Sequence, residues 1–368
     1  MKILWITEFF PATSAGEITG GVEARCFYVS RYLKKRGVEL EVITRPTGGE
    51  TWYHASLSSI PNRILFTLKA IIKGLGTDFD LVEGSNSATY PVAALLGLLK
   101  RKPIVFWYPD VFQGSWVAKV GLVGILGNIS DWILFKMPNV HYIAISQTTK
   151  RKLMSKGVSE LKITVIYCGI EPKEISAIKT NGQKTTLSAV SRLVAYKHLD
   201  ELIKAGQILV QKHPDLSVSI IGQGPEEQKL KNLAKRIGVA KNINFLGFVK
   251  DHKDVLGVVN KSQVFVHPST VEGFGIALME AAALGVPYVA ARLPIVTEVT
   301  RTGQGGLLFA AGNHHDLASK IDQLLTSRKL YLTKAKQAAA LAAHYSWHEA
   351  AKQTERLYRK RVQNKAIA

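Results

Sequence analysis

The segment from Val266 to Ala290 reads VHPSTVEGFGIALMEAAALGVPYVA and is the most informative about the fold. An apolar strand ends at its start, and a polar turn follows. The pattern then predicts a helix over Ile276 to Leu284, which Gly285 and Pro287 end before a second apolar strand begins. A strand, a glycine-containing loop, a helix and another strand make up the repeating unit of a parallel α/β sheet.

The loop before this helix carries two features that indicate chemistry. Gly273 and Gly275 lie where the loop becomes a helix N-terminus, and there the missing side chains and free N–H groups favour an anion such as phosphate. Glu272 precedes the helix, and Glu280 lies inside it among apolar residues. A carboxylate on such a helix is costly unless it has a partner, and sugar or ribose hydroxyls are natural partners.

Two cations follow another predicted strand of the same half. Arg192 and Lys197 lie in the loop directly after Leu187 to Ser191. Arginine binds phosphate by a forked contact and lysine acts as a point charge, so the pair suits a diphosphate. The same cations would stabilise the negative charge that develops when a diphosphate leaves. The alternative is that Arg192 and Lys197 are solvated surface side chains that bind no ligand.

The first half opens with a βαβ unit. The strand Lys2 to Thr7 leads through the loop Glu8 to Gly21 into a helix over Val22 to Arg36, and Glu39 to Thr44 is the second strand. No G-x-G-x-x-G follows the first strand, which argues against an NAD-dependent oxidoreductase. Further strands are predicted at Leu81-Val82, Ile104 to Trp107 and Tyr142 to Ile145.

Polar residues follow some of these strands. Asn86 lies at the carboxyl end of one, where ligands bind in open α/β sheets. Asp110 lies in the aromatic-rich segment Phe106 to Trp116 and is predicted to contact an acceptor hydroxyl or the donor sugar, with a plain turn residue as the alternative. Asp78-Phe79-Asp80 mimics a D-x-D metal motif, but its place before a strand favours a turn.

Glu272, the intervening GFGIALM, Glu280 and the following AAALGVPYVA together resemble the signature of the retaining glycosyltransferases of family 4. Ser191-Arg192-Leu193 with Lys197 resembles the G-R-L…K-G motif of that family. The resemblance implies an α/β chain with the GT-B fold, in which two Rossmann-like parallel-sheet domains face a cleft. Residues 1–175 would bind the acceptor, residues 185–345 would bind the nucleotide sugar, and a helix over residues 346–368 would return to the first domain.

The resemblance also implies roles for single residues. Arg192 and Lys197 would stabilise the leaving diphosphate, Glu272 would hold sugar hydroxyls, and Glu280 would take the ribose hydroxyls. No metal and no cofactor beyond the donor would be required, because the two cations and the helix dipole supply the positive charge. The implied catalytic set is Glu272, Arg192, Lys197 and Asp110, and the implied donor-binding set is Gly20, Gly21, Arg192, Lys197, Gly222, Gly224, Phe248, Phe274, Gly275, Ile276 and Glu280.

The chain departs from the family pattern at a few places. Tyr108-Pro109-Asp110 stands roughly where many members have a His that contacts the donor sugar, so that His cannot be carried over. Ser191 and His198 replace common glycines, and Cys168 replaces an Asn in the turn that closes the first domain. The polar segment Pro172 to Lys184 is predicted to be the interdomain linker.

Composition limits the class of partner. The chain has 368 residues, a formal net charge of +20 and a pI near 9.8, which suits nucleotide diphosphates or anionic lipid headgroups. No Lys/Arg run interleaved with aromatics marks a nucleic-acid site. Two distant cysteines and a strand directly after Met1, with no signal peptide before it, fit a cytoplasmic setting.

Two segments are candidates for contact with a membrane face. Trp116 to Phe135 is apolar and would be either an amphipathic element that dips into a membrane or receives a lipid tail, or a core helix. The last helix has a basic face that would be either solvated or placed on an anionic membrane, and it carries Lys352, Arg356, Arg359, Lys360 and Arg361. The longest apolar stretches, such as Val92 to Leu99, fall short of the roughly 18 residues that span a bilayer.

The predicted function is retaining, metal-independent transfer of a hexose-type sugar from a UDP- or GDP-sugar to a hydroxyl of a glycan or lipid-linked acceptor. This reaction would serve glycan biosynthesis at the cytoplasmic face of the plasma membrane, with no nucleic-acid partner. A nucleotide-sugar epimerase or hydrolase on the same fold remains open, and so does a non-catalytic nucleotide-sugar-binding protein.

Overall fold

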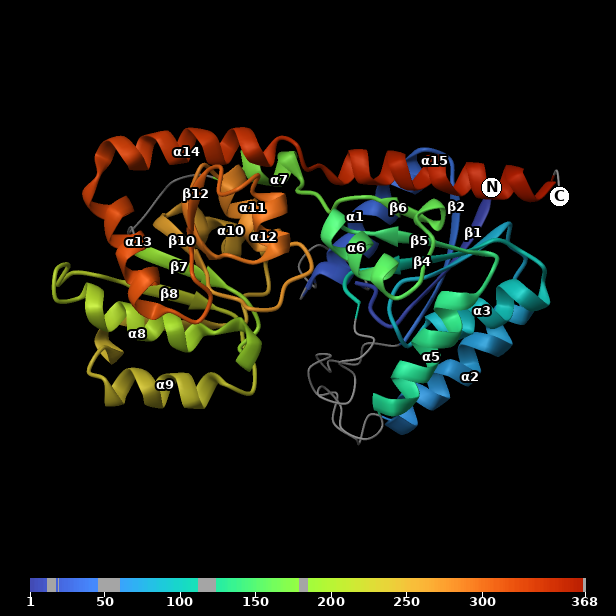
Figure 1. Ribbon diagram of the computed structural model, residues 1–368, viewed down its shortest axis with the longest axis horizontal. Coiled ribbons are helices and arrows are strands. Elements are labelled where there is room, and N and C mark those ends of the chain that lie inside the picture. The colour runs from blue at the N-terminus through green and yellow to red at the C-terminus, as the bar shows by residue number, and fades with distance from the viewer. Residues whose placement is uncertain (12–17, 19, 46–59, 112–123, 179–184, 367–368) are drawn as a thin grey trace. The chain divides into compact units, whose positions relative to one another are not determined.

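The computed structural model describes residues 1–11, 18, 20–45, 60–111, 124–178 and 185–366. The chain divides into two compact units, which we call unit 1 (Met1–Cys168 with Trp347–Ala368) and unit 2 (Gly169–Ser346). Each unit contains a six-stranded sheet surrounded by helices (Figure 1). The predicted α/β architecture with two parallel sheets is therefore confirmed.

The sheet of unit 1 has the strand order β2-β1-β3-β4-β5-β6, and every neighbouring pair is parallel. Its central strands are continuous apolar runs buried on both faces, which is typical of a parallel sheet covered by helices on each side. The strands are β1 (Lys2–Thr7), β2 (Glu39–Thr44), β3 (Leu81–Gly84), β4 (Ile104–Tyr108), β5 (Val140–Ala144) and β6 (Ile163–Val165).

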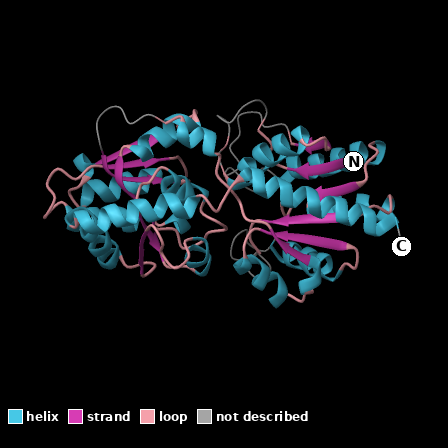
Figure 2. Ribbon diagram, turned by 90° about the horizontal axis from the view of Figure 1, so that it is seen from above, coloured by secondary structure: helices cyan, strands magenta, loops and turns pink. Residues whose placement is uncertain are grey.

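The helices of unit 1 cover the sheet on both sides (Figure 2). They are α1 (Gly21–Lys35), α2 (Ile60–Gly76), α3 (Tyr90–Leu99), α5 (Gly124–Lys136), α6 (Gln147–Ser155) and α15 (Trp347–Ala366). Phe66 of α2, Leu96 of α3 and Phe135 of α5 share one core with Leu4 and Phe106 of the sheet. These three helices therefore form one layer on one face, whereas α15 packs against α1.

A buried polar cluster anchors α15 in unit 1. Arg25 of α1 forms an ion pair with Glu83 of β3, and the guanidinium carbon lies 4.4 Å from the ring centroid of Trp5. Tyr358 of α15 donates its hydroxyl to Glu83 and accepts a hydrogen bond of 2.9 Å from Trp5 Nε1. Because each of these buried groups depends on the others for its hydrogen bonds, the cluster fixes α15 at one position on the sheet.

The sheet of unit 2 has the strand order β12-β11-β10-β7-β8-β9 and is also parallel throughout. Its strands are β7 (Thr185–Val190), β8 (Val218–Ile221), β9 (Ile243–Gly247), β10 (Ser262–His267), β11 (Tyr288–Ala291) and β12 (Gly306–Phe309). Its helices are α7 (Pro172–Ser176), α8 (Leu199–Leu209), α9 (Glu227–Arg236), α10 (His252–Asn260), α11 (Ile276–Ala283), α12 (Pro294–Val299), α13 (His314–Thr326) and α14 (Arg328–Ala342).

The order of strands in unit 2 locates the candidate site. From β7 the chain builds the sheet in one direction, through β8 and β9, and from β10 it builds in the other, through β11 and β12. The point where the direction changes lies between β7 and β10, and ligands of open α/β sheets bind outside the strand ends at such a point. The loops that follow these two strands are those that carry Arg192 and Glu272.

Two predicted segments fall partly outside the described residues. The predicted linker is not extended throughout, since its first residues form the short helix α7 within unit 2, and residues 179–184 lie outside the description. Of the apolar stretch Trp116 to Phe135, the part up to residue 123 lies outside it, and the rest belongs to α5. Among the described residues, no helix has the length and apolar character to cross a membrane.

Candidate functional site

The loops after β7 and β10 are joined by hydrogen bonds near the switch point of unit 2. The first loop contains a short 3-10 turn, Ala195–Lys197. The carbonyl oxygen of Tyr196 in that turn accepts hydrogen bonds from Thr270 N (3.0 Å) and Ser269 Oγ (3.4 Å) in the second loop. This junction places Lys197 beside Glu272, although the two residues are far apart in the sequence.

Lys197 and Glu272 form a largely buried ion pair. Lys197 Nζ lies 2.9 Å from one carboxylate oxygen of Glu272 and 3.1 Å from the other, and the two side chains are 11% and 13% exposed. His267 Nε2 lies 3.2 Å from the same carboxylate, but its orientation is unsuitable for a hydrogen bond. Burial alone would raise the pKa of Glu272, yet Lys197 and His267 outweigh it and hold that pKa well below its usual range. The carboxylate is therefore a fixed, ionised acceptor for a hydroxyl group.

Arg192 and Lys197 lie near the same aromatic ring. The guanidinium carbon of Arg192 and the ammonium nitrogen of Lys197 are each 5.8 Å from the ring centroid of Tyr196. The sequence predicted that these two cations act together, and the structure brings both into one loop at the carboxyl end of β7. Their contact with a diphosphate stays a prediction.

Gly222 and Gly224 support the loop that carries Arg192. Gly222 has φ +130°, and a Cβ atom on it would lie 1.9 Å from the carbonyl oxygen of Ser191. A Cβ atom on Gly224 would lie 2.3 Å from the carbonyl oxygen of Leu193. The two glycines were predicted to lie near the nucleotide, and the structure gives them a positioning role, because only a chain without side chains fits beneath this loop.

The N-terminus of α11 is formed as the sequence predicts. Gly275 is the N-cap residue at φ +89°, a left-handed conformation that favours glycine, and Ile276 is the first helical residue. The buried ring of Phe274 packs edge to face on Tyr345, with ring centroids 5.3 Å apart. This packing fixes the backbone just before the free N–H groups of the helix, where a phosphate is predicted to bind.

Glu280 has a protein partner that sequence reasoning missed. His252 Nε2, at the first residue of α10, lies 2.9 Å from Glu280 Oε1, and both side chains are mostly buried. Burial lowers the pKa of His252, but Glu280, with smaller effects of Glu174 and Asp251, raises it to about 9. Among the described residues none hydrogen-bonds the second oxygen of Glu280. That oxygen is available to a hydroxyl of a ligand, and the carboxylate does not depend on the ligand for its charge balance.

Some predicted site residues lie outside this cluster. Phe248 follows β9 in unit 2 and has an exposed ring, so its contact with a base stays a prediction. Gly20 and Gly21 form the N-cap and first residue of α1 in unit 1. Asp110, also in unit 1, accepts hydrogen bonds from Lys152 Nζ (2.6 Å) and from the backbone N–H next to it (2.8 Å). These contacts are those of a turn residue with a cationic partner.

Unit 1 has a polar pair at its own switch point, between β1 and β3. Glu8 follows β1 and is buried, and Asn86 follows β3. Asn86 Nδ2 donates a hydrogen bond of 2.7 Å to Glu8, and Arg63 Nε lies 3.4 Å from the second carboxylate oxygen. The sequence indicated Asn86 as a position at a strand end but gave no signal for Glu8.

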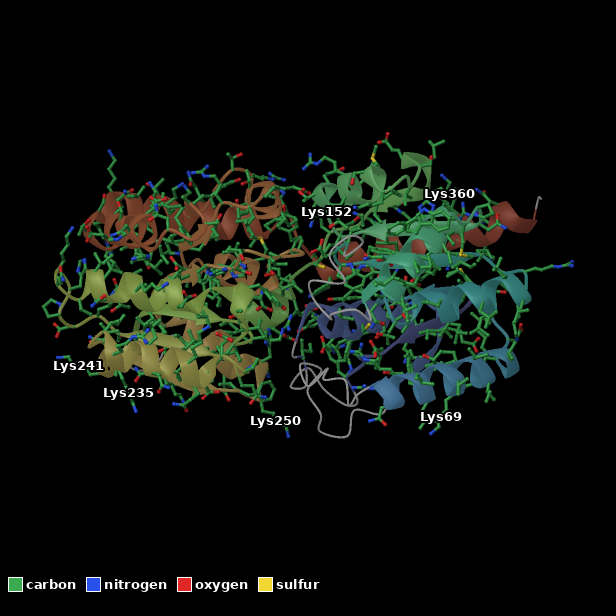
Figure 3. All side chains as sticks on the ribbon, turned by 60° about the horizontal axis from the view of Figure 1, so that its bottom comes forward. Lys69, Lys152, Lys235, Lys241, Lys250 and Lys360 are labelled. Atoms are coloured by element: carbon green, nitrogen blue, oxygen red, sulfur yellow. The ribbon has the colours of Figure 1, made fainter. Side chains whose placement is uncertain are left out.

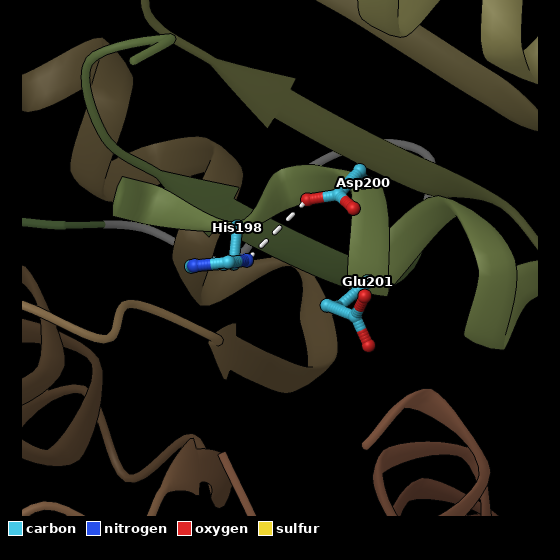
Figure 4. Close-up of side chains that lie close together, drawn as sticks. All are labelled: His198, Asp200 and Glu201. Atoms are coloured by element: carbon cyan, nitrogen blue, oxygen red, sulfur yellow. Dashed lines mark ion pairs between the residues drawn. The ribbon is translucent and has the colours of Figure 1, made fainter. Parts of the chain in front are cut away.

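One cluster of metal-ligand type lies beside the site in unit 2 (Figure 4). His198, Asp200 and Glu201 offer ligand atoms within 4.8 Å of one another. Lys204 Nζ lies 2.8 Å from Asp200 and 2.9 Å from Glu201, so a protein cation already contacts both carboxylates. His198 adopts φ +47°, which explains why glycine is common at this position in the family that the sequence resembles.

Comparisons with known proteins cover nearly the whole chain. Residues 19–174 match the family model Glycosyltransferase Family 4, and residues 171–342 match Glycosyl transferases group 1. An uncharacterized glycosyltransferase of Haemophilus influenzae is 31% identical over 164 residues, which is 44% of this chain and 46% of that relative. One of Methanocaldococcus jannaschii is 26% identical over 98% of both chains. A component of the human phosphatidylinositol N-acetylglucosaminyltransferase is 27% identical over 92% of this chain and 73% of its own.

Solved structures with the same fold were also found. HepE of Anabaena in complex with UDP has a TM-score of 0.75 at 20% identity, covering 98% of this chain and 100% of its own. WaaG, a glycosyltransferase involved in lipopolysaccharide biosynthesis, has a TM-score of 0.72 at 16% identity, covering 95% and 98%. At these identities the likeness establishes the fold.

Proposed function

For this chain, which belongs to glycosyltransferase family 4 and has the GT-B fold, we propose transfer of a hexose-type sugar from a UDP- or GDP-sugar to a hydroxyl of a glycan or lipid-linked acceptor. The observation that carries the proposal is the Lys197–Glu272 pair beside Arg192 at the switch point of unit 2. It joins an ionised carboxylate, suited to sugar hydroxyls, with cations suited to a diphosphate. UDP bound to HepE, a protein of the same fold, supports the donor class.

In the proposed mechanism the anomeric configuration is retained. The acceptor oxygen attacks the anomeric carbon on the face from which the diphosphate leaves, and the leaving phosphate oxygen takes the acceptor proton. Arg192 and Lys197 stabilise the charge on the departing diphosphate, together with the N-terminus of α11. Glu272 orients the donor sugar, and the second oxygen of Glu280 accepts a ribose hydroxyl. These protein charges replace a metal ion in the proposed reaction.

The proposed acceptor is lipid-linked and lies at the inner face of the plasma membrane. The human phosphatidylinositol N-acetylglucosaminyltransferase acts, by its name, on a lipid, and WaaG is involved in lipopolysaccharide biosynthesis. These relatives support an acceptor of this class, and the basic charge of the chain supports contact with an anionic surface.

The reaction type is tested by nucleoside diphosphate release from UDP- and GDP-sugars, with and without a lipid extract as acceptor. A transferase releases diphosphate rapidly only with the acceptor and makes a labelled lipid product. Release at the same rate without acceptor would contradict transfer and favour a hydrolase or epimerase. Glu272→Gln should lower the rate about 100-fold or more while the protein stays folded, as expected for an oriented contact at the reacting sugar.

A further inference from the structure

Most exposed apolar surface of the described chain is concentrated on three helices of unit 1. Of the 19 large apolar side chains that are exposed, 13 lie on α2, α3 and α5. Ile72 of α2 is 72% exposed and Trp132 of α5 is 53% exposed. Single exposed apolar residues are common on proteins, but a concentration of this kind marks a surface that binds a protein or a membrane.

These side chains face one way. The inner faces of α2, α3 and α5 share one core on one side of the sheet, and α3 packs against both of the other helices. On α2 the exposed residues Ile64, Leu68, Ile72 and Leu75 recur every three or four positions, which places them along one stripe opposite the buried Phe66 and Ala70. The outward stripes of the three helices therefore form the outer side of one layer, which we call the apolar helix face.

The charged side chains of the three helices are almost all basic. The segments 60–76, 90–102 and 124–136 contain seven lysines and arginines and one acidic residue, Asp131, which is buried. Lys69 projects outward from α2 (Figure 3), and Lys136 Nζ lies 3.8 Å from the ring centroid of Trp132. Asp78, in the turn after α2, is exposed, and the half-buried Glu41 pairs with Lys73.

We propose that the apolar helix face docks on an anionic lipid bilayer, with its apolar side chains at the level of the acyl chains and its lysines and arginines at the headgroups. Helices that lie in a bilayer surface combine apolar side chains with a basic rim, and tryptophan is favoured at that depth. A second copy of this chain is a poor occupant, because a symmetric dimer would place the same basic rim against itself. The inference deepens the proposed function, since a bilayer is where a lipid-linked acceptor would be met.

Flotation of the full chain with vesicles tests this docking directly. In 0.15 M salt the protein should float with phosphatidylcholine vesicles that contain phosphatidylglycerol, and should float much less with phosphatidylcholine alone. The double variant Ile72→Glu/Trp132→Glu should lower the partition coefficient between vesicles and buffer about tenfold or more, because it removes two apolar side chains that would be buried in the bilayer. A matched control is Leu161→Glu/Leu332→Glu, which makes the same charge change at exposed apolar sites elsewhere and should bind like the wild type.

A second pair of variants tests the charge. Lys69→Gln/Lys73→Gln should weaken binding by about fivefold for each lysine removed. The control Lys235→Gln/Lys241→Gln makes the same change on exposed lysines of unit 2 (Figure 3) and should have little effect. Equal losses in test and control variants would overturn the proposal, because they would show a general charge effect.

Two further outcomes also overturn it. Wild-type protein that stays with the buffer in the presence of phosphatidylglycerol vesicles does not dock on an anionic bilayer. A dimer detected by sedimentation that Ile72→Glu/Trp132→Glu dissociates, without flotation, would assign the face to a second copy of the chain. Flotation is measured without nucleotide or acceptor, so its failure leaves the proposed reaction standing, and a failed reaction assay leaves the docking result standing.

Discussion

Replacing Lys197 by methionine would leave the Glu272 carboxylate buried without its main cation. Removal of one partner from a buried ion pair costs about 3–5 kcal/mol. The pair is not completely buried, since its two side chains are 11% and 13% exposed, so we expect a value near the lower limit. For a unit of this size about 3 kcal/mol corresponds to a fall in Tm of roughly 6–12 °C.

The pH dependence of this loss follows from the low pKa of Glu272. A carboxyl group whose pKa is depressed on folding contributes stability above its unfolded pKa, and the contribution is lost as the pH falls through the folded pKa. The difference in stability between the wild type and Lys197→Met should therefore be complete at pH 7 and shrink in strong acid.

Urea unfolding of single and double variants separates the role of the pair in stability from its role in the reaction. Lys197→Met/Glu272→Gln removes both charges and should recover most of the lost free energy of unfolding, while diphosphate release stays low. Lys229→Met is a matched control, because its ion pair with Glu226 lies at the surface, with side chains 79% and 27% exposed, and is worth about 1 kcal/mol or less. A loss below about 1 kcal/mol in Lys197→Met, or a double variant as unstable as the single one, would show that Glu272 does not depend on Lys197 for its charge balance.

Three more substitutions test the contacts of His252, Gly222 and Tyr358. His252→Gln should flatten the pH dependence of the free energy of unfolding in urea. Because folding raises the pKa of His252 to about 9, protonated His252 contributes stability that is complete below pH 6.5 and lost as the pH rises through 9. Between pH 6 and 10 the wild type should therefore lose about 3 kcal/mol more stability than the variant. Equal slopes would contradict the contact with Glu280. Gly222→Ala should cost about 3 kcal/mol or more in the same assay, because its Cβ would lie 1.9 Å from a carbonyl oxygen and its φ is +130°; a wild-type midpoint would contradict the positioning role. Tyr358→Phe removes the hydroxyl that joins α15 to the buried cluster and should cost about 1–3 kcal/mol, and an unchanged Tm would show that the cluster does not anchor the helix.

The local sequence pattern was sufficient to predict the main strands and helices of the fold. The apolar runs predicted parallel α/β units in both halves, and the family resemblance implied the two separate sheets. Gly275 and Gly285 marked the limits of α11 to within one residue, since the helix ends at Ala283. The glycines at these limits have positive φ, a conformation that favours glycine, so the residue type alone indicates the end of the helix. The proximity of Lys197 and Glu272 could be predicted, because each residue follows one of the two strands that are neighbours at the switch point.

Contacts between distant elements could not be predicted in this way. His252 meets Glu280 only because α10 and α11 pack together, and no spacing in the sequence signals that pair. The position of Gly222 and Gly224 near the nucleotide stays a prediction, whereas their close approach to the carbonyl oxygens of Ser191 and Leu193 had no signal in the sequence. The apolar helix face could not be predicted for another reason. Because α2 is apolar both where it packs on the sheet and where it faces outward, its composition does not distinguish the buried side from the exposed side.

A thermal-shift panel of UDP, GDP and ADP with their sugar conjugates tests whether unit 2 binds a nucleoside diphosphate at Arg192, Lys197 and the N-terminus of α11. One nucleotide should raise Tm in the presence of EDTA, by the equivalent of about 2.7 kcal/mol at 100 times its Kd, because it binds only the folded state. Arg192→Ala should reduce that shift. No shift with any nucleotide on folded wild-type protein, or a shift that EDTA abolishes, would contradict the metal-independent donor site.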